Sequence, residues 1–236
     1  MRQPIKISLV GIFLTGSLYG LIGAASPILR SLQFRDDFEG GDLTAWEFPY
    51  SEDWVIQSEG ANHFLHMLRR REPGVPRRPL QFARLSKAEV GSFALETQVR
   101  RAGTSLIIVF NYVDTMHFYY AHLSADRGTT QPVHNGLFIV HGEPRKRIAG
   151  VEAAPALPDR GWHTVRIRRD VPSGSIEVFV DGDKEPRFSV VDRTFNCGQV
   201  GMGSFDETGD FDDFRLTSSD AGCEPGAVLR PASNPQ

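Results

Sequence analysis

The stretch that decides the fold reads GWHTVRIRRDVPSGSIEVFVDG over residues 161–182. Apolar residues alternate with polar ones on both sides of a Pro-Ser-Gly turn: Val165, Ile167, Ile176, Val178 and Val180. A period of two is typical of strands that bury one face. Asp181-Gly182 then favours a tight hairpin turn, whose two central residues need positive φ angles. The stretch therefore predicts consecutive antiparallel strands.

Short strand-like segments separated by turn signals continue in both directions from this stretch. They predict strands over residues 93–100, 106–112, 117–123, 136–141, 188–191, 200–204 and 212–217. The 23 glycines and 15 prolines favour a fold with many turns. After residue 25 no helical period extends beyond two turns, so we expect an all-β sandwich or barrel.

The composition excludes several classes of protein. A chain of 236 residues, 40% hydrophobic and 23% charged, is typical of a folded domain rather than a disordered or fibrous one. The formal net charge is −3 and no long basic run could follow a phosphate backbone, so nucleic acid is not expected as a partner. No Gly-rich phosphate loop, GxSxG elbow or HExxH helix occurs, and we expect no organic cofactor.

The first 25 residues have the layout of a secretory signal peptide. Arg2 and Lys6 precede an apolar run over 7–22, and small residues up to Ala25 offer a cleavage site. The alternative is a retained membrane anchor, for which the run is short. We therefore expect a secreted or periplasmic protein, with no membrane span in the mature chain. The expected organisation is then a linker at 26–33, one domain at 34–217 and a C-terminal tail at 218–236.

Cys197 and Cys223 are the only cysteines of the chain. An oxidising compartment favours a bridge between them, which would tie the C-terminal segment to the region around Cys197. Two free thiols are the alternative, because a disulfide requires Cα atoms within about 7 Å.

Several motifs, in this order, resemble the concanavalin A-like lectin/glucanase superfamily. They are DDF at 36–38 with Trp46, the stretch at 161–182, GQVGMGSFD at 198–206 and GDFDDFRL at 209–216. The superfamily covers laminin G-like modules, family 16 glycoside hydrolases and 3-keto-disaccharide hydrolase-like domains. The resemblance implies a jelly-roll β-sandwich of two antiparallel sheets, one of them concave, over residues 34–217.

The resemblance leaves three functions open, because this fold carries many activities. The first is binding of a poly- or oligosaccharide on the concave sheet by a secreted monomer. The second is hydrolysis of a saccharide, as in the 3-keto-disaccharide hydrolase-like domains. The third is a non-catalytic extracellular structural or adhesion module.

The catalytic signature of family 16 hydrolases is absent. That signature, Glu-x-Asp-x-Glu, places two carboxylates on one face of one strand, and no such spacing occurs here. Glu96 and His122 remain as the first acid/base candidates of an enzyme of another design.

The densest group of polar and aromatic residues lies between residues 111 and 141. Sugar sites combine aromatic faces with amide and imidazole groups, so this group predicts a ligand site, although aromatic residues also fill sandwich cores. In a strand over 117–123, Tyr120 and His122 would lie on the face opposite Tyr119. We expect one open concave ligand-binding patch, with Glu96 and Arg145 near its edges, lined by Tyr112, Tyr120, His122, His134 and Asn135. The spacing of the histidines does not fit a three-histidine metal site.

Two arginine-rich segments, 69–78 and 145–147, could clamp an acidic polysaccharide or could be solvated loops. The resemblance also implies a structural calcium ion between the opening Asp-Phe segment and the last strand. The matching residues are Asp37 and Asp212, and calcium takes six to eight oxygen ligands. The alternative is that these aspartates are solvated or bond to Arg35 or Arg215.

Overall fold

The computed structural model describes residues 30–86, 88–129, 134–221 and 223. The predicted signal peptide and most of the predicted tail lie outside the described residues.

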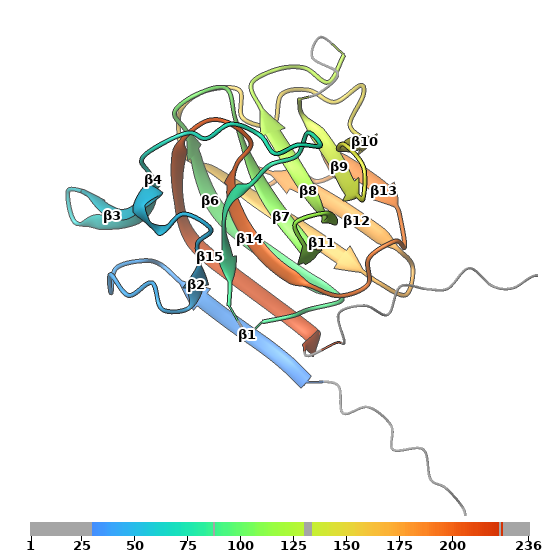
Figure 1. Ribbon diagram of the computed structural model, residues 1–236, viewed down its shortest axis with the longest axis horizontal. Helices are drawn as coiled ribbons and strands as arrows, with labels where there is room; N and C mark the ends of the chain where they lie inside the picture. The colour runs from blue at the N-terminus through green and yellow to red at the C-terminus, as the bar shows by residue number, and fades with distance from the viewer. Residues whose placement is uncertain (1–29, 87, 130–133, 222, 224–236) are drawn as a thin grey trace, which may run out of the picture.

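The described chain forms two stacked antiparallel sheets (Figure 1). The eight-stranded sheet has the order β13 (Phe188–Val191), β12 (Ser175–Val180), β11 (His163–Asp170), β6 (Phe93–Arg101), β15 (Gly209–Ala221), β4 (Asn62–Met67) and β3 (Trp54–Glu59), with β1 (Arg30–Asp36) also paired to β15. The seven-stranded sheet has the order β10 (Lys146–Ala149), β9 (Gly136–His141), β8 (His117–Ser124), β7 (Ser105–Asp114), β14 (Gln199–Ser204), β5 (Gln81–Leu85) and β2 (Trp46–Glu47). A short 3₁₀ helix, η1, spans Ser51–Asp53. The predicted all-β sandwich is confirmed.

Alternation in β6 and β11 builds the eight-stranded sheet as the sequence predicts. In β6 the inward residues Phe93, Leu95, Thr97 and Val99 are buried, and the residues between them are half-buried. Asp181 and Gly182 take φ angles of 50° and 75°, which confirms the left-handed turn after β12. The main core lies between the sheets, where residues such as Leu95, Val165 and Ile167 join Ile108, Phe110 and Tyr119 of the other sheet.

The seven-stranded sheet has a second apolar layer on its outer face. The residues that share this face and form one buried cluster are Phe82, Ile107, Val109, Tyr112, Phe118, Tyr120, Phe138, Val140 and Phe205. Residues 105–112 of β7 and 118–124 of β8 are therefore buried on both sides of the sheet. Strands covered on both faces are apolar almost throughout, which is why 106–112 shows little alternation.

The ends of the domain differ from the expectation. β1 begins at Arg30 rather than near residue 34, and β15 continues to Ala221 rather than ending at Thr217. The two strands pair with each other from Asp36↔Phe214 to Arg30↔Ala221, so the ends of the domain support one another.

The β3–β4 hairpin was not predicted, because its alternation is broken by polar residues at Gln57, Ser58 and His63.

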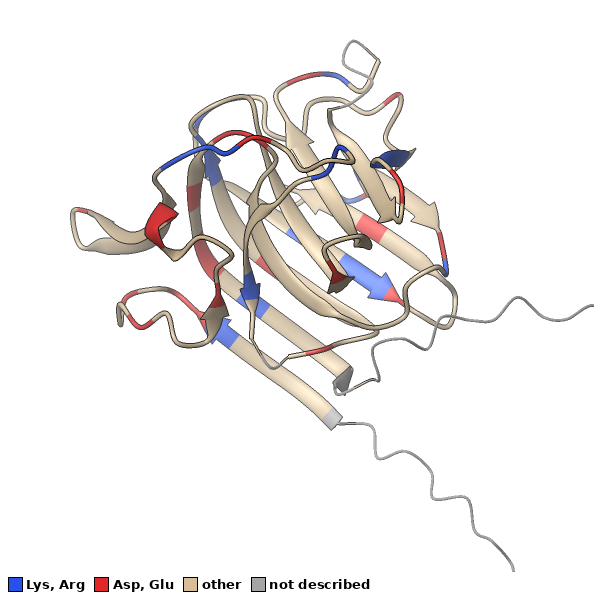
Figure 2. Ribbon diagram, viewed as in Figure 1, with Lys and Arg blue, Asp and Glu red and all other residues tan. Residues whose placement is uncertain are grey.

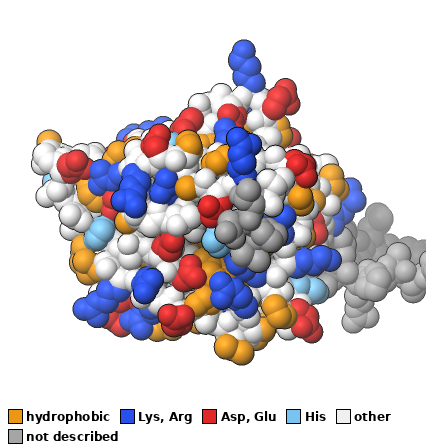
Figure 3. Space-filling view, turned by 90° about the horizontal axis from the view of Figure 1, so that it is seen from above, with side chains coloured by type: hydrophobic (Ala, Val, Ile, Leu, Met, Phe, Trp, Pro, Cys, Tyr) orange, Lys and Arg blue, Asp and Glu red, His pale blue; other side chains and the backbone are white. Residues whose placement is uncertain are grey.

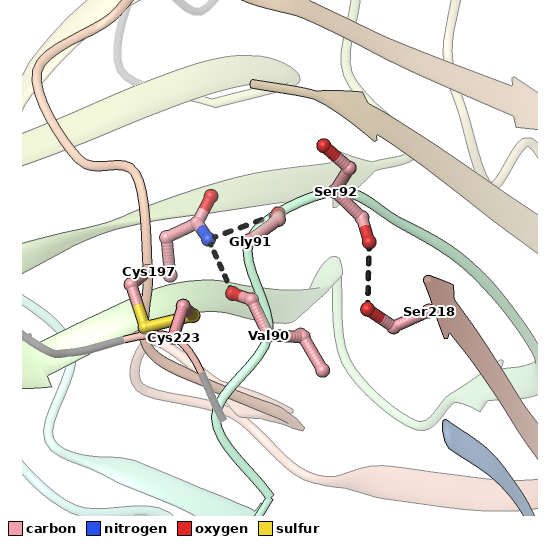
Figure 4. The surroundings of a disulfide bond; sticks show 7 residues. Val90, Gly91, Ser92, Cys197, Ser218 and Cys223 are labelled. Carbon is pink, nitrogen blue, oxygen red and sulfur yellow. Dashed lines mark hydrogen bonds between the residues drawn. A yellow bond between two sulfur atoms is a disulfide. The ribbon is translucent and has the colours of Figure 1, made fainter. Parts of the chain in front are cut away.

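The predicted disulfide is present. The Sγ atoms of Cys197 and Cys223 are bonded, and their Cα atoms lie 5.8 Å apart (Figure 4). Nearby, the Ser218 hydroxyl donates to the carbonyl of Ser92, which ties β15 to the start of β6. Among the residues that the structure describes, no helix is long and apolar enough to cross a membrane.

Candidate functional site

Four of the six predicted ligand residues meet at one end of the seven-stranded sheet. Arg145 Nη1 donates to the Tyr120 hydroxyl at 3.1 Å and lies 3.1 Å from His122 Nδ1. The rings of His122 and His134 are 5.3 Å apart between centroids. Because both Tyr120 and His122 point outward from β8, the expected separation of the two faces of this strand is confirmed.

Phe205 and two arginines cover these residues. The Phe205 ring stacks on His122 with the planes 18° apart and the centroids at 5.8 Å. The Arg145 guanidinium lies 3.9 Å from the centre of the same ring, and that of Arg77 lies 4.9 Å from it. A backbone hydrogen bond of 2.9 Å from Arg145 to the Arg77 carbonyl joins the two arginine segments. We call Arg77, Tyr120, His122, His134, Arg145, Phe205 and Asp206 the Arg145 site.

Arg145 holds an unused hydrogen-bond donor. Its Nη2 atom is buried and has no hydrogen-bond partner among the described residues. A buried donor without an acceptor costs about 1–3 kcal/mol, so such a group is a natural contact for a ligand oxygen.

The rim of the site carries carboxylates beside its cations. The Asp206 carboxylate lies 3.9 Å from the Arg77 guanidinium. The Asp126 carboxylate is hydrogen-bonded to His134 Nδ1 at 2.8 Å. Burial, followed by the neighbouring Glu207 carboxylate, raises the pKa of Asp206 above its ordinary value. Figure 3 views this end of the molecule from above and shows basic and acidic side chains intermingled over it.

The prediction that these residues form an open patch is wrong, because most of them are buried. Tyr120 and Asn135 are 0% exposed, His122 is 1% exposed and Tyr112 is 7% exposed. Phe205 and the arginines come from loops far away in the sequence and cover this face, so only the Arg145, Arg77, His134 and Asp206 side chains reach the surface.

The Asn135 side chain is hydrogen-bonded to the backbone of neighbouring segments. Its Oδ1 accepts from the backbone of Ser124 and Ala156, and its Nδ2 donates to the Ala154 carbonyl at 2.7 Å. Its φ angle of 54° lies in the left-handed region, which asparagine tolerates better than most residues. Asn135 therefore holds loops together rather than lining the patch.

Glu96 lies on the other sheet. It projects from β6 to the outer face of the eight-stranded sheet, where its carboxylate is 3.6 Å from Arg215 Nη1. The expectation that Glu96 borders the aromatic patch is therefore wrong, because the whole sandwich separates it from His122.

His122 is neutral at its position. Burial lowers its pKa well below the ordinary value, and the Arg145, His134 and Arg77 charges lower it further. Arg145 can only donate, so His122 Nδ1 accepts and Nε2 carries the proton that it donates to Ser105 Oγ at 2.9 Å. A neutral ring closed off from solvent is poorly placed to exchange protons with a substrate.

The two residues of the expected calcium site have separate protein partners. The Asp212 carboxylate accepts from Asn62 Nδ2 at 3.0 Å and from the backbone of Asp213, and burial raises its pKa. Asp37 is half-exposed and lies 3.3 Å from Arg35 Nη2. Within the described ranges, no group of three or more His, Cys, Asp or Glu residues is arranged to hold a metal ion.

Sequence reasoning missed Phe205 and Asp206 as parts of the site. Both follow β14 inside the motif GQVGMGSFD, whose pattern indicates the fold but not which side chains reach His122. Their nearness to His122 depends on the pairing of β14 with β7, which a single sequence does not reveal.

Comparison with known families finds no family profile that matches this chain. A search of curated proteins finds no sequence match either. Solved structures do match in three dimensions. The carbohydrate binding module CBM66 from Bacillus subtilis has a TM-score of 0.53 at 15% identity, over 74% of this chain and 96% of the module.

Two further structures extend the comparison. The winged bean acidic lectin complexed with methyl-α-D-galactose has a TM-score of 0.52 at 13% identity, over 80% of this chain and 99% of the lectin. A xylan β-1,4-xylosidase from Bacillus halodurans has a TM-score of 0.54 at 15% identity, over 78% of this chain but only 39% of that enzyme. At these identities the likeness concerns the fold alone. The chain has the two-sheet sandwich fold of concanavalin A-like lectins and glucanases.

Proposed function

We propose that this chain binds a glycan at the Arg145 site. The observation that carries the proposal is the Arg145 guanidinium, which stacks on Phe205 and donates to the Tyr120 hydroxyl, while its Nη2 is buried without an acceptor among the described residues. A fixed guanidinium presents its donors in a rigid plane, which suits vicinal hydroxyls or a carboxylate.

The other rim groups complement such a ligand. Asp206 can accept from sugar hydroxyls, and Arg77 and His134 add donors around the same ring. Similar folds include a carbohydrate binding module and a lectin solved with methyl-α-D-galactose, which supports a saccharide as the ligand class.

A second candidate function is saccharide hydrolysis, and one observation favours it. Asp206 is a half-exposed carboxyl whose pKa is raised by burial and by Glu207, as a general acid requires. We favour binding, because the Glu-x-Asp-x-Glu signature of family 16 hydrolases is absent from the sequence.

The test is a glycan array of neutral, uronate-containing and sulfated oligosaccharides. Arg145→Met should lower affinity at least tenfold for at least one glycan that the wild type binds, and Arg145→Lys should restore part of that affinity. Lys146→Met is the matched control, because Lys146 is an exposed cation next in sequence whose side chain forms no hydrogen bond or ion pair with the described residues.

Retention of affinity by a folded Arg145→Met variant would overturn the proposed site. A wild type that binds no glycan would instead favour a structural or adhesion module. Release of reducing sugar by the wild type but not by Asp206→Asn would establish the second candidate function.

We also propose that the protein is exported as a monomer. The disulfide supports export, because disulfides persist in oxidising compartments. N-terminal sequencing of the mature protein from the extracytoplasmic fraction, and its mass by size-exclusion chromatography with light scattering, test the two statements.

A further inference from the structure

We propose a second glycan-binding surface on the outer face of the eight-stranded sheet, which takes an uncharged, hydroxyl-rich oligosaccharide. Two neighbouring hollows, of about 350 and 370 Å³, lie on this face. β6 contributes to both, since Glu96 lines the first hollow and Gln98 and Arg100 line the second. This surface is separate from the Arg145 site, which lies on the other sheet.

The first hollow has an aromatic floor and an unused donor. Phe179 of β12 lies beneath the Arg166 guanidinium, whose carbon is 4.7 Å from the ring centre. The Nε atom of Arg166 is buried and has no hydrogen-bond partner among the described residues. Thr164 and Asp181 complete the rim with a hydroxyl and a carboxylate. The hollow therefore offers one donor that the protein does not use beside groups that can accept.

The second hollow combines a tryptophan with amides and carboxylates. Trp162 is half-buried, and the Arg100 guanidinium lies 4.6 Å from its ring centre. Asn62 and Gln98 use their Nδ2 and Nε2 atoms to donate to Asp212 and Asp213. Their amide oxygens face no donor among the hydrogen bonds of the described residues, so they can accept from sugar hydroxyls.

A bulge in β15 creates the acidic side of this hollow. The pairing of β15 with β6 shifts between Asp212 and Arg215, and Asp213 takes a φ angle of 49°. A bulge re-aims side chains, and here two consecutive aspartates line the same hollow. Figure 2 shows this acidic part of β15 beside the basic end of β6.

The charges on this face favour an uncharged ligand. Arg100 pairs with Glu59 and with Asp210, each at 2.7 Å, and Arg215 lies 3.6 Å from Glu96. Since Arg100 and Arg215 already have anionic partners, a polyanion would have to displace these pairs, whereas sugar hydroxyls can bond to them as they are. Glu96 and Arg100 are four residues apart on one face, about 13 Å along the strand, so one extended oligosaccharide can reach both hollows.

Native affinity electrophoresis in gels containing xylan, mannan or mixed-linkage β-glucan tests the proposal. Trp162→Ala removes the ring of the second hollow, and Thr164→Arg fills the first hollow without deleting a buried contact. Each should raise the apparent dissociation constant at least fivefold. Ser189→Arg is the matched control, because Ser189 is exposed on β13 opposite Glu177 and lines neither hollow. It should migrate as the wild type does.

The Arg145→Met variant separates this proposal from the proposed function. If Arg145→Met and Trp162→Ala each weaken retardation and the double variant abolishes it, both surfaces bind. If Trp162→Ala and Thr164→Arg keep wild-type retardation, the second surface is overturned. If they lose retardation while Arg145→Met keeps it, the second surface stands and the Arg145 site falls. A wild type that no polysaccharide retards overturns both.

Discussion

Arg145 donates a hydrogen bond of 3.1 Å from Nη1 to the phenolic oxygen of Tyr120, a residue with no exposed surface. This contact attaches the segment before β10 to the outer face of β8. It also orients the guanidinium on which the proposed glycan site depends, so its removal should affect stability and binding together.

Tyr120→Phe should lower the free energy of unfolding by about 1–2 kcal/mol, because a hydrogen bond to a charged group is lost without a change of shape. Urea unfolding followed by tryptophan fluorescence measures this. Tyr112→Phe is the matched control, since its hydroxyl makes no hydrogen bond in the described structure, and it should cost less than about 0.5 kcal/mol. Equal losses in the two variants would contradict the assigned role of the Tyr120 contact.

His122 should make the protein less stable in mild acid. Burial and then the Arg145 charge lower its folded pKa well below the ordinary value, so below about pH 6.5 the unfolded chain binds a proton that the folded chain does not. His122 therefore does not lower the free energy of unfolding above pH 6.5. Below pH 6.5 it lowers that free energy by up to about 1.4 kcal/mol per pH unit. Urea unfolding between pH 7.5 and 5 measures the slope.

His122→Phe should flatten this pH dependence, whatever its effect on absolute stability, because the ring fits beside Phe205 but does not titrate. His141→Gln removes an exposed histidine and should leave the slope as in the wild type. An unchanged slope in His122→Phe would assign the acid sensitivity to another group.

The disulfide should contribute about 3.5 kcal/mol to stability, since it closes a loop with a sequence separation of 26 in the unfolded chain. The double variant Cys197→Ser/Cys223→Ser should unfold at lower urea concentration than the oxidised wild type, and at the same concentration as the wild type in reductant. Thiol alkylation of the native protein without reductant should label neither cysteine. Labelling of both would show that the bridge is absent in the exported protein.

Calcium binding at Asp37 and Asp212 remains a prediction from the resemblance. The resemblance predicts that Tm rises with calcium and falls with chelator, by mass action on the native state. Asp212→Asn should abolish that response, while Asp42→Asn, a change at an exposed aspartate of the same region, should not. An identical Tm in calcium and in chelator would remove the metal from consideration.

The sequence by itself determined the fold class, the strands of β6, β11 and β12, and the turn at Asp181-Gly182. These depend on local rules, namely the alternation of side chains along a strand and the φ angles that Asp and Gly tolerate. The disulfide pairing could also be predicted from the sequence, because a chain with two cysteines allows one intramolecular pairing.

Only the tertiary structure decided what covers each face. Alternation placed Tyr119 and Tyr120 on opposite sides of β8, but a strand pattern does not say whether a face meets solvent or another segment. Phe205 lies 83 residues beyond His122 in the chain and covers the outer face of β8 at His122. The Arg145 guanidinium packs on the Phe205 ring. Likewise, the registers of β11 and β15 against β6 place Glu96 on the sheet opposite His122. Such long-range pairings arise from the packing of the whole sandwich, and no local stretch of sequence specifies them.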